Sequence, residues 1–193
     1  MGLYIHSLGE LPVGAQRAYY VYLLDYGWEE AFGDAVRRNL PRMAEAASRS
    51  DAVVIHGPRG VHFEDEVLSW HHLNQQPGED ILPALMITTR HPATIRDSYG
   101  PTRGGRVPPD ALVLIPLKKA CGSPEAVVDL IARVFRDIAE KKELPDFQVV
   151  REMRRGVGGA LVDSLILEPK IGGVGINLKK LAQFFKSMKH PAR

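Results

Sequence analysis

The stretch RSDAVVIHGPRGVHFEDEVLSWHHLN, residues 49–74, contains the pattern that decides the fold. Residues 51–57 form an apolar run that ends at Gly-Pro, and such continuous runs are typical of strands covered on both faces. Residues 63–74 have the apolar spacing of a short helix and include three consecutive acidic residues. A covered strand followed by a helix predicts a layered α/β domain.

The flanking sequence extends this alternation of strands and helices. Strands are expected at residues 2–8, 18–27, 80–89 and 111–117, and helices at 28–50 and 124–138. Pro41 lies within the first helix, so a kink or two helices meeting near Asn39 are expected. Residues 90–110 hold four prolines and three glycines and are expected to form a long loop.

The last third of the chain predicts an antiparallel edge. Residues 147–153 and 159–169 look like two strands joined by the Gly-rich turn RRGVGG, and residues 172–188 look like a Gly loop entering a final helix. We therefore expect a single α/β domain over residues 1–193, a three-layer sandwich. Its sheet should be mixed and mostly parallel, with an antiparallel hairpin near the C-terminus.

Composition narrows the function classes. The chain has 193 residues, 45% of them hydrophobic and 25% charged, as expected for a soluble globular domain. Its one cysteine, Cys121, permits no intramolecular disulfide and suits a reducing compartment, so we expect a cytoplasmic protein. Residues 1–15 lack the features of a signal peptide, and no apolar run approaches the ~20 residues of a membrane helix.

The charge is unevenly distributed. Residues 1–100 carry 8 arginines and 13 acidic residues, a net −5, whereas residues 101–193 carry 17 basic and 10 acidic residues, a net +7. One interpretation is self-association or a partner protein, and another is an anionic partner for the basic half. Nucleic-acid binding would need the basic residues on one face with stacking aromatic side chains, and we do not expect it.

Helical spacing separates the polar residues of the segment 63–74. Its expected core face consists of Phe63, Val67, Trp70 and Asn74, with Glu66 at the edge of that face. Asp65 and His72 should point to water, and Glu64 and His71 should share the other flank. A carboxylate aimed inward is either paired or has a raised pKa, so Glu66 is the candidate catalytic group and an ion pair with an arginine is the alternative.

Other residues complete the candidate sites. Trp70 and His71 could contact a ligand beside Glu66, and Arg59 or Arg90 could bind its phosphate, with residues 90–110 as a lid. The segment GGVGIN could present backbone N–H groups to an anion, although a simple helix entry is the commoner explanation of such a segment. Its candidate residues are Gly172, Gly173, Gly175, Lys179 and Lys180. No metal-ligand motif is present, and we expect no metal.

Residues 20–87, from YVYLLDYGWEEAFG through HFEDEVLSWHHLN to DILPALMI, resemble the central part of a TIR domain. The last part is also similar to nucleoside deoxyribosyltransferases. The shared pattern is a strand ending near an aspartate and a glycine, a helix, an apolar strand, a helix with an acidic residue, and another apolar strand. The resemblance implies cleavage of an N-glycosidic bond, as in NAD breakdown, with Glu66, or alternatively Glu64, contacting the ribose.

Two functions therefore follow as hypotheses. The first is a non-catalytic interaction or ligand-sensing module that self-associates through its charge-complementary halves. The alternative is a TIR-like enzyme that cleaves the N-glycosidic bond of NAD or a related nucleotide. No cofactor is assigned, and NAD or another nucleotide enters only as a substrate.

Overall fold

A computed structural model describes residues 1–27, 31–58, 62–73, 81–99 and 111–154. Its five strands are β1 (Gly2–Tyr4), β2 (Tyr19–Leu24), β3 (Ala52–His56), β4 (Ala84–Thr88) and β5 (Leu112–Pro116). Its helices are α1 (Ala31–Ser48), α2 (Phe63–Trp70), α4 (Pro92–Tyr99), α5 (Leu117–Ala120), α6 (Pro124–Ala139) and α7 (Gln148–Arg154). Two 3-10 turns are η1 (Leu8–Glu10) and η2 (Leu144–Asp146).

The strands form one mixed sheet in the order β1-β3-β2-β4-β5. Strands β1, β3 and β2 run parallel, while β4 runs antiparallel to both β2 and β5, so four of the five strands point the same way. The peptide between Leu82 and Pro83, just before β4, is cis. The sequence prediction of a mixed, mostly parallel α/β sheet is confirmed.

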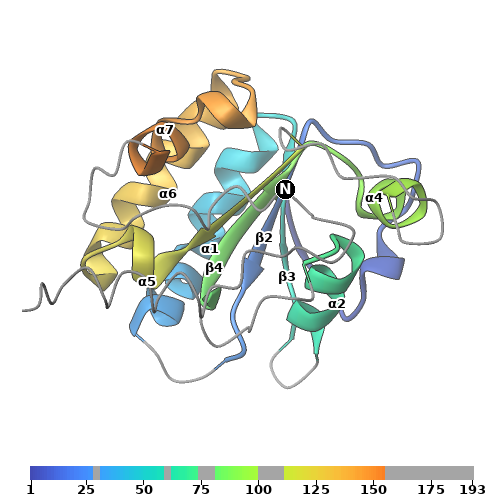
Figure 1. Cartoon of the computed structure of the whole chain (residues 1–193), viewed down its shortest axis with the longest axis horizontal. Coiled ribbons are helices and arrows are strands. Elements are labelled where there is room, and N and C mark those ends of the chain that lie inside the picture. Colours follow the sequence, from blue (N-terminus) through green and yellow to red (C-terminus); the bar gives the residue numbers. More distant parts are fainter. Residues whose placement is uncertain (28–30, 59–61, 74–80, 100–110, 155–193) are drawn as a thin grey trace, which may run out of the picture.

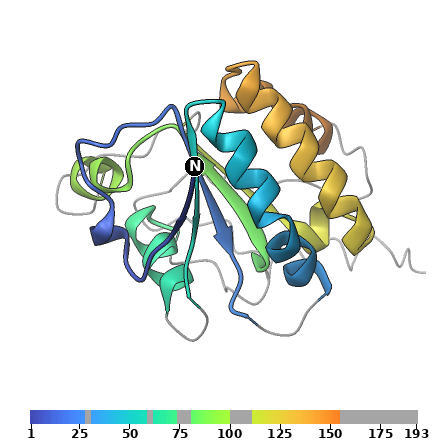
Figure 2. The same ribbon diagram turned by 180° about the vertical axis from the view of Figure 1, so that it is seen from behind.

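Helices cover both faces of the sheet (Figures 1 and 2). Helices α1, α6 and α7 lie on one face, and α2 and α4 lie on the other together with η1. This is the three-layer arrangement expected from the alternation of strands and helices. Within the described ranges, no helix is long and apolar enough to cross a membrane.

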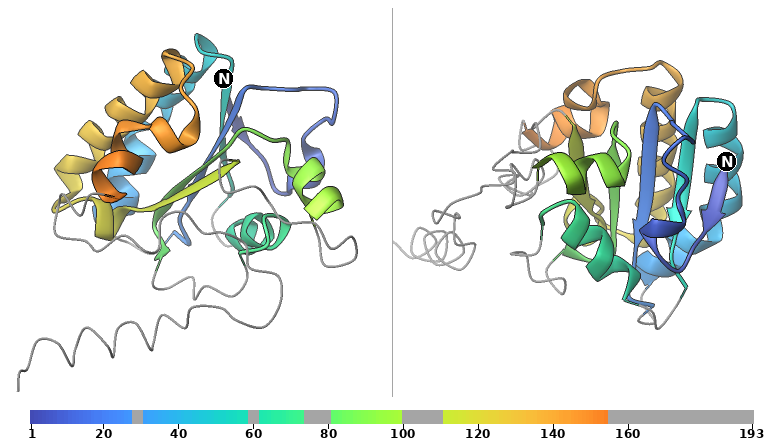
Figure 3. Two further views of the ribbon diagram at one scale, coloured as in Figure 1. Left: turned by 45° about the horizontal axis from the view of Figure 1, so that its top comes forward. Right: turned by 90° about the vertical axis from the view of Figure 1, so that its right-hand side faces the viewer.

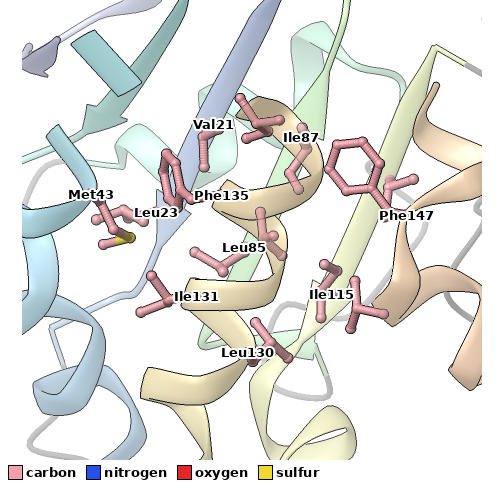
Figure 4. Packing of buried hydrophobic residues seen from close by; sticks show 14 of the residues in the cluster. Val21, Leu23, Met43, Leu85, Ile87, Ile115, Leu130, Ile131, Phe135 and Phe147 are labelled. Carbon is pink, nitrogen blue, oxygen red and sulfur yellow. The ribbon is translucent and has the colours of Figure 1, made fainter. Parts of the chain in front are cut away.

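The central strands are buried on both faces, which explains their continuous apolar sequences. In β2, Tyr19, Val21 and Leu23 face the layer of α1, α6 and α7. The alternate residues Tyr20, Tyr22 and Leu24 face α2 and α4. Figure 4 shows the first core, where side chains of β2, β4 and β5 meet those of α1 and α6 and the Phe147 ring just before α7.

The prediction of a strand at residues 147–153 is wrong, because Gln148–Arg154 form helix α7. The buried Asp137 carboxylate accepts a hydrogen bond from the Gln148 backbone N–H at 2.6 Å, which satisfies a donor at the start of the helix. Val149, Val150 and Met153 are buried at helical spacing against α6. The second half of the expected hairpin, residues 159–169, lies outside the described residues.

Three further boundaries differ from the sequence prediction. Residues 92–99 of the expected loop form helix α4, where Pro92 suits a first turn and Ile95 is buried. Helix α1 continues through Pro41 as one element rather than as two. Strand β1 ends at Tyr4, because Ser7 caps the turn η1 through a bond from the Gly9 N–H to its Oγ at 3.1 Å.

Candidate functional site

Polar groups gather where the parallel strands β2 and β3 end. Asp25 follows β2 and Gly57 follows β3, and the parallel register of these strands places both residues at the same end of the sheet, where the two strands end. Helix α2 begins close by, since a Cβ atom on Gly57 would overlap the Phe63 side chain. In parallel α/β sheets the carboxyl ends of the strands commonly carry binding sites. The residues around Asp25 and the first turn of α2 are therefore the candidate site.

Asp25 is held in place by helix α1. Its carboxylate is 8% exposed and forms an ion pair with Arg37, which also pairs with Asp34. Asp25 Oδ1 accepts a hydrogen bond from the Gly27 N–H at 3.1 Å. Gly33 leaves the space that this carboxylate occupies, because a Cβ there would lie 2.6 Å from Asp25 Oδ2. Asp25 is therefore a compensated, buried charge.

Glu64 lies beside Asp25 and is far less compensated. The residue is 4% exposed, and its Oε1 accepts the Asp25 backbone N–H at 3.3 Å. Burial raises the pKa of the Glu64 carboxyl from 4.5 to about 7, and the negative charges of Asp25 and Asp65 add to this effect. A carboxyl with such a pKa can both donate and accept a proton near neutral pH.

Asp65 forms the exposed rim of the same turn. The Tyr26 hydroxyl donates a hydrogen bond to Asp65 Oδ1 at 2.7 Å, and His62 Nδ1 lies 2.9 Å from Asp65 Oδ2. The Tyr26–Asp65 bond and the Asp25–Glu64 bond join the segment after β2 to the first turn of α2. Asp65 faces water as the sequence predicted.

Glu66, the predicted catalytic residue, instead fastens α2 to η1. Its Oε1 accepts the Ser7 hydroxyl at 2.8 Å, and its Oε2 accepts the Leu8 N–H at 2.9 Å. Both carboxylate oxygens thus have donors from the chain itself, on the side of α2 away from Asp25. Glu66 thus forms hydrogen bonds that join α2 to η1, in place of the ion pair with an arginine that was the alternative to a catalytic role.

The predicted ligand-binding residues are dispersed. Trp70 is half-buried beneath the Arg96 guanidinium, which lies 4.1 Å from its ring centroid and links α2 to α4. Arg90 is exposed and lies over the Tyr99 ring at 5.7 Å. Arg90 follows β4, and the last residues of β4 pair with the first residues of β2. Arg90 therefore lies near the start of β2, whereas Glu64 lies near its end.

His71 is enclosed in the core rather than presented to a ligand. It is fully buried, its Nδ1 lies 2.7 Å from the Val67 carbonyl oxygen, and its ring meets Tyr22 edge-on with centroids 5.3 Å apart. Burial lowers the pKa of His71 from 6.5 to about 4, so the imidazole is neutral at physiological pH. The Nδ1 contact requires a donor there, which leaves Nε2 as the bare acceptor.

The buried face of α2 differs from the predicted one. Its buried residues are Phe63, Glu64, Val67 and Leu68, with His71 just beyond the helix end, so the face is rotated toward the flank that sequence spacing had assigned to Glu64. His72 is half-buried rather than turned to water, with a positive φ of 60°. Burial of Leu68 and His71 against the sheet draws Glu64 inward and leaves Glu66 at the rim.

Arg59 and the anion-binding candidates Gly172, Gly173, Gly175, Lys179 and Lys180 lie outside the described residues. Cys121 is buried, and burial raises the pKa of its thiol to about 11. In the part of the chain that the structure describes, no group of three or more His, Cys, Asp or Glu side chains is arranged to hold a metal ion.

Asp25, Arg37 and Gly33 were not predicted from the sequence as site residues. An aspartate directly after a fully apolar strand was the signal that could have identified Asp25. A scan against protein-family models finds no match, and searches of curated proteins and of solved structures find none either. The resemblance to TIR domains therefore stays a prediction.

Proposed function

We propose that this chain is a non-catalytic interaction or ligand-sensing module that self-associates. The observation that supports it is the position of Glu66, whose two carboxylate oxygens hold the turn η1 instead of facing a ligand. Trp70, the expected neighbour of a bound ligand, is likewise engaged by Arg96. The groups that suggested catalysis from sequence thus serve to join η1, α2 and α4.

The charge distribution supports self-association. Residues 155–193 carry 7 basic and 2 acidic residues, whereas residues 111–154 carry 8 basic and 7 acidic residues. The basic excess of the second half therefore lies mostly in the last 39 residues, and the first 100 residues carry the opposite charge. Attraction between unlike surfaces of two copies is electrostatic and is screened by salt.

Sedimentation velocity at low and high ionic strength tests this proposal. The wild type should associate more strongly at about 50 mM salt than at about 1 M salt, where the Debye length falls to about 3 Å. Replacing Lys179 and Lys180 together by glutamate should weaken the association. Replacing the exposed Lys119 and Arg136 by glutamate changes the net charge equally and should weaken it less. A wild type that is monomeric at both salt concentrations would contradict the charge-driven association.

A second function is supported by Glu64. Its raised pKa of about 7 is what a group exchanging protons at neutral pH requires. With the resemblance to TIR domains, this supports a nucleotide-cleaving enzyme in which Glu64, rather than Glu66, contacts the ribose of NAD or a related nucleotide. Asp25 and its partner Arg37 would border the same site.

Release of nicotinamide from NAD by the purified chain tests this second function. Glu64→Gln should abolish the release, whereas Glu66→Gln, two residues away on the same helix, should retain it wherever the variant is folded. Circular dichroism of both variants verifies folding. Absence of release by the wild type, or full activity of Glu64→Gln, would exclude this role of Glu64.

A further inference from the structure

Strand β1 forms one rim of the sheet and is paired on one side only (Figure 3, right). Its ladder with β3 includes the bond from the Val54 N–H to the Met1 carbonyl at 2.8 Å and the bond from the Ile5 N–H to the His56 carbonyl at 3.1 Å. Leu3 lies between these bonds, opposite Ile55. The side of β1 away from β3 is therefore the open edge of the sheet.

The open edge consists of the backbone groups of Gly2 and Tyr4. Successive residues of a strand direct their N–H and C=O groups to opposite sides, so Leu3 faces β3 while Gly2 and Tyr4 face outward. Both residues are exposed, Tyr4 to 61%. Among the described residues, none forms a hydrogen bond with the outward N–H and C=O groups of Gly2 and Tyr4.

This edge is complementary to itself. When two copies of β1 run antiparallel about a two-fold axis at Leu3, Gly2 of each copy lies opposite Tyr4 of the other. Each such pair exchanges two N–H···O=C bonds, so four outward donors meet four outward acceptors. An isologous pairing of this kind closes after two copies and leaves no strand edge at the junction.

The side chains suit the same arrangement. Gly2 packs so closely on α1 that a Cβ there would lie 2.8 Å from Ala44 Cβ, so this position is bare of a side chain. The exposed Tyr4 ring, stacked on His56 with centroids 5.6 Å apart, lies next to the open edge, where a second copy would contact it. Gly2, Leu3 and Tyr4 carry no charge that would oppose edge pairing.

The geometry points to a two-fold symmetric dimer of this chain, in which β1 pairs with β1 of a second copy and one continuous sheet crosses the interface. The dimer deepens the proposed self-association by assigning it an interface. It differs from the charge-driven association in its response to salt, because backbone pairing and apolar contact persist at about 1 M salt.

Sedimentation velocity at about 1 M salt tests the pairing through Tyr4. Tyr4→Pro removes an outward N–H without removing a bond to β3, and edge strands tolerate proline at such positions. Each copy loses one bond, and two losses of roughly fivefold each should weaken dimerisation about twenty-five-fold. Tyr4→Val also loses the ring but keeps the N–H, and should remain the tighter of the two. A wild type that is monomeric at this salt, or equal dimerisation by both variants, would overturn the proposal.

A cysteine at the two-fold axis provides an independent test. Directly opposed residues that do not exchange hydrogen bonds have Cα atoms about 4.5 Å apart, within the range that a disulfide spans. Leu3→Cys should therefore form a disulfide-linked dimer under mild oxidation. Gly14→Cys, in an open position on an exposed loop, should not. The native Cys121 is buried and does not compete. Equal cross-linking of the two variants would overturn the proposal, even where charge-driven association is observed.

Discussion

Replacing Glu64 by glutamine should make the protein more stable at alkaline pH. Burial raises the pKa of Glu64 from 4.5 to about 7, so between these values the folded chain keeps a proton that the unfolded chain has released. Stability therefore falls as pH rises through this window, by up to about 1.4 kcal/mol per pH unit. Over the whole window the carboxyl costs about 3 kcal/mol at pH 8.

Glutamine carries no ionisable proton and avoids this cost. We expect Glu64→Gln to be more stable than the wild type by up to about 3 kcal/mol at pH 8, and the difference to vanish near pH 4.5. Urea unfolding of both proteins from pH 4.5 to 8 measures it. Only the difference is informative, because His71 titrates in an overlapping range with the opposite sign. Its lowered pKa of about 4 removes stability as pH falls below 6.5.

Glu66→Gln is the matched control on the same helix. It should lower stability at pH 8, because the amide cannot accept both the Ser7 hydroxyl and the Leu8 N–H as the carboxylate does. A Glu64→Gln variant that is no more stable than the wild type at pH 8 would refute the raised pKa. A stability difference that does not change with pH would refute it equally.

Glu66→Ala should lower the free energy of unfolding by about 2–4 kcal/mol, since both of its bonds are lost. A double-mutant cycle with Ser7→Ala should give a coupling of about 1 kcal/mol, and additive effects would argue against the hydrogen bond between Ser7 and Glu66. Gly57→Ala should lower the free energy of unfolding in urea by about 2 kcal/mol or more, because the added methyl group overlaps the buried Phe63 side chain. A urea midpoint equal to that of the wild type would contradict this contact. Cys121 should react with an aromatic disulfide reagent at pH 8 at least tenfold more slowly in the folded chain than in urea, since burial raises its thiol pKa to about 11; equal rates would show that the thiol is accessible.

Local patterns in the sequence were sufficient to predict the layered architecture. The apolar runs at residues 51–57 and 111–117 are buried on both faces because helices cover the sheet from each side, and this periodicity is readable without knowing which strands are neighbours. The amphipathic spacing of residues 124–138 likewise predicted α6 almost to its ends. These elements depend on the nearest residues along the chain, which the sequence states directly.

The element at residues 147–153 shows where local patterns are insufficient. Its β-branched residues favour a strand, yet the buried Asp137 carboxylate accepts the N–H of Gln148, and α6 offers an apolar surface that a helix can cover. A partner eleven residues away along the chain thus outweighs intrinsic propensity. The short helix α4 within the expected loop follows the same principle, since Ile95 gains burial only when the sheet is present.

The roles of the two glutamates were decided by tertiary structure alone. The sequence established that residues 64–66 are acidic and lie on a helix, and therefore that they are not equivalent. It placed Glu66 nearer the core, because helical spacing alone does not fix the rotation of a helix on its sheet. The donors of Ser7 and Leu8 hold Glu66 at the rim, and Leu68 and His71 draw Glu64 into the interior. Loss of water around a carboxyl raises its pKa, and only the packing of distant segments determines which carboxyl loses it.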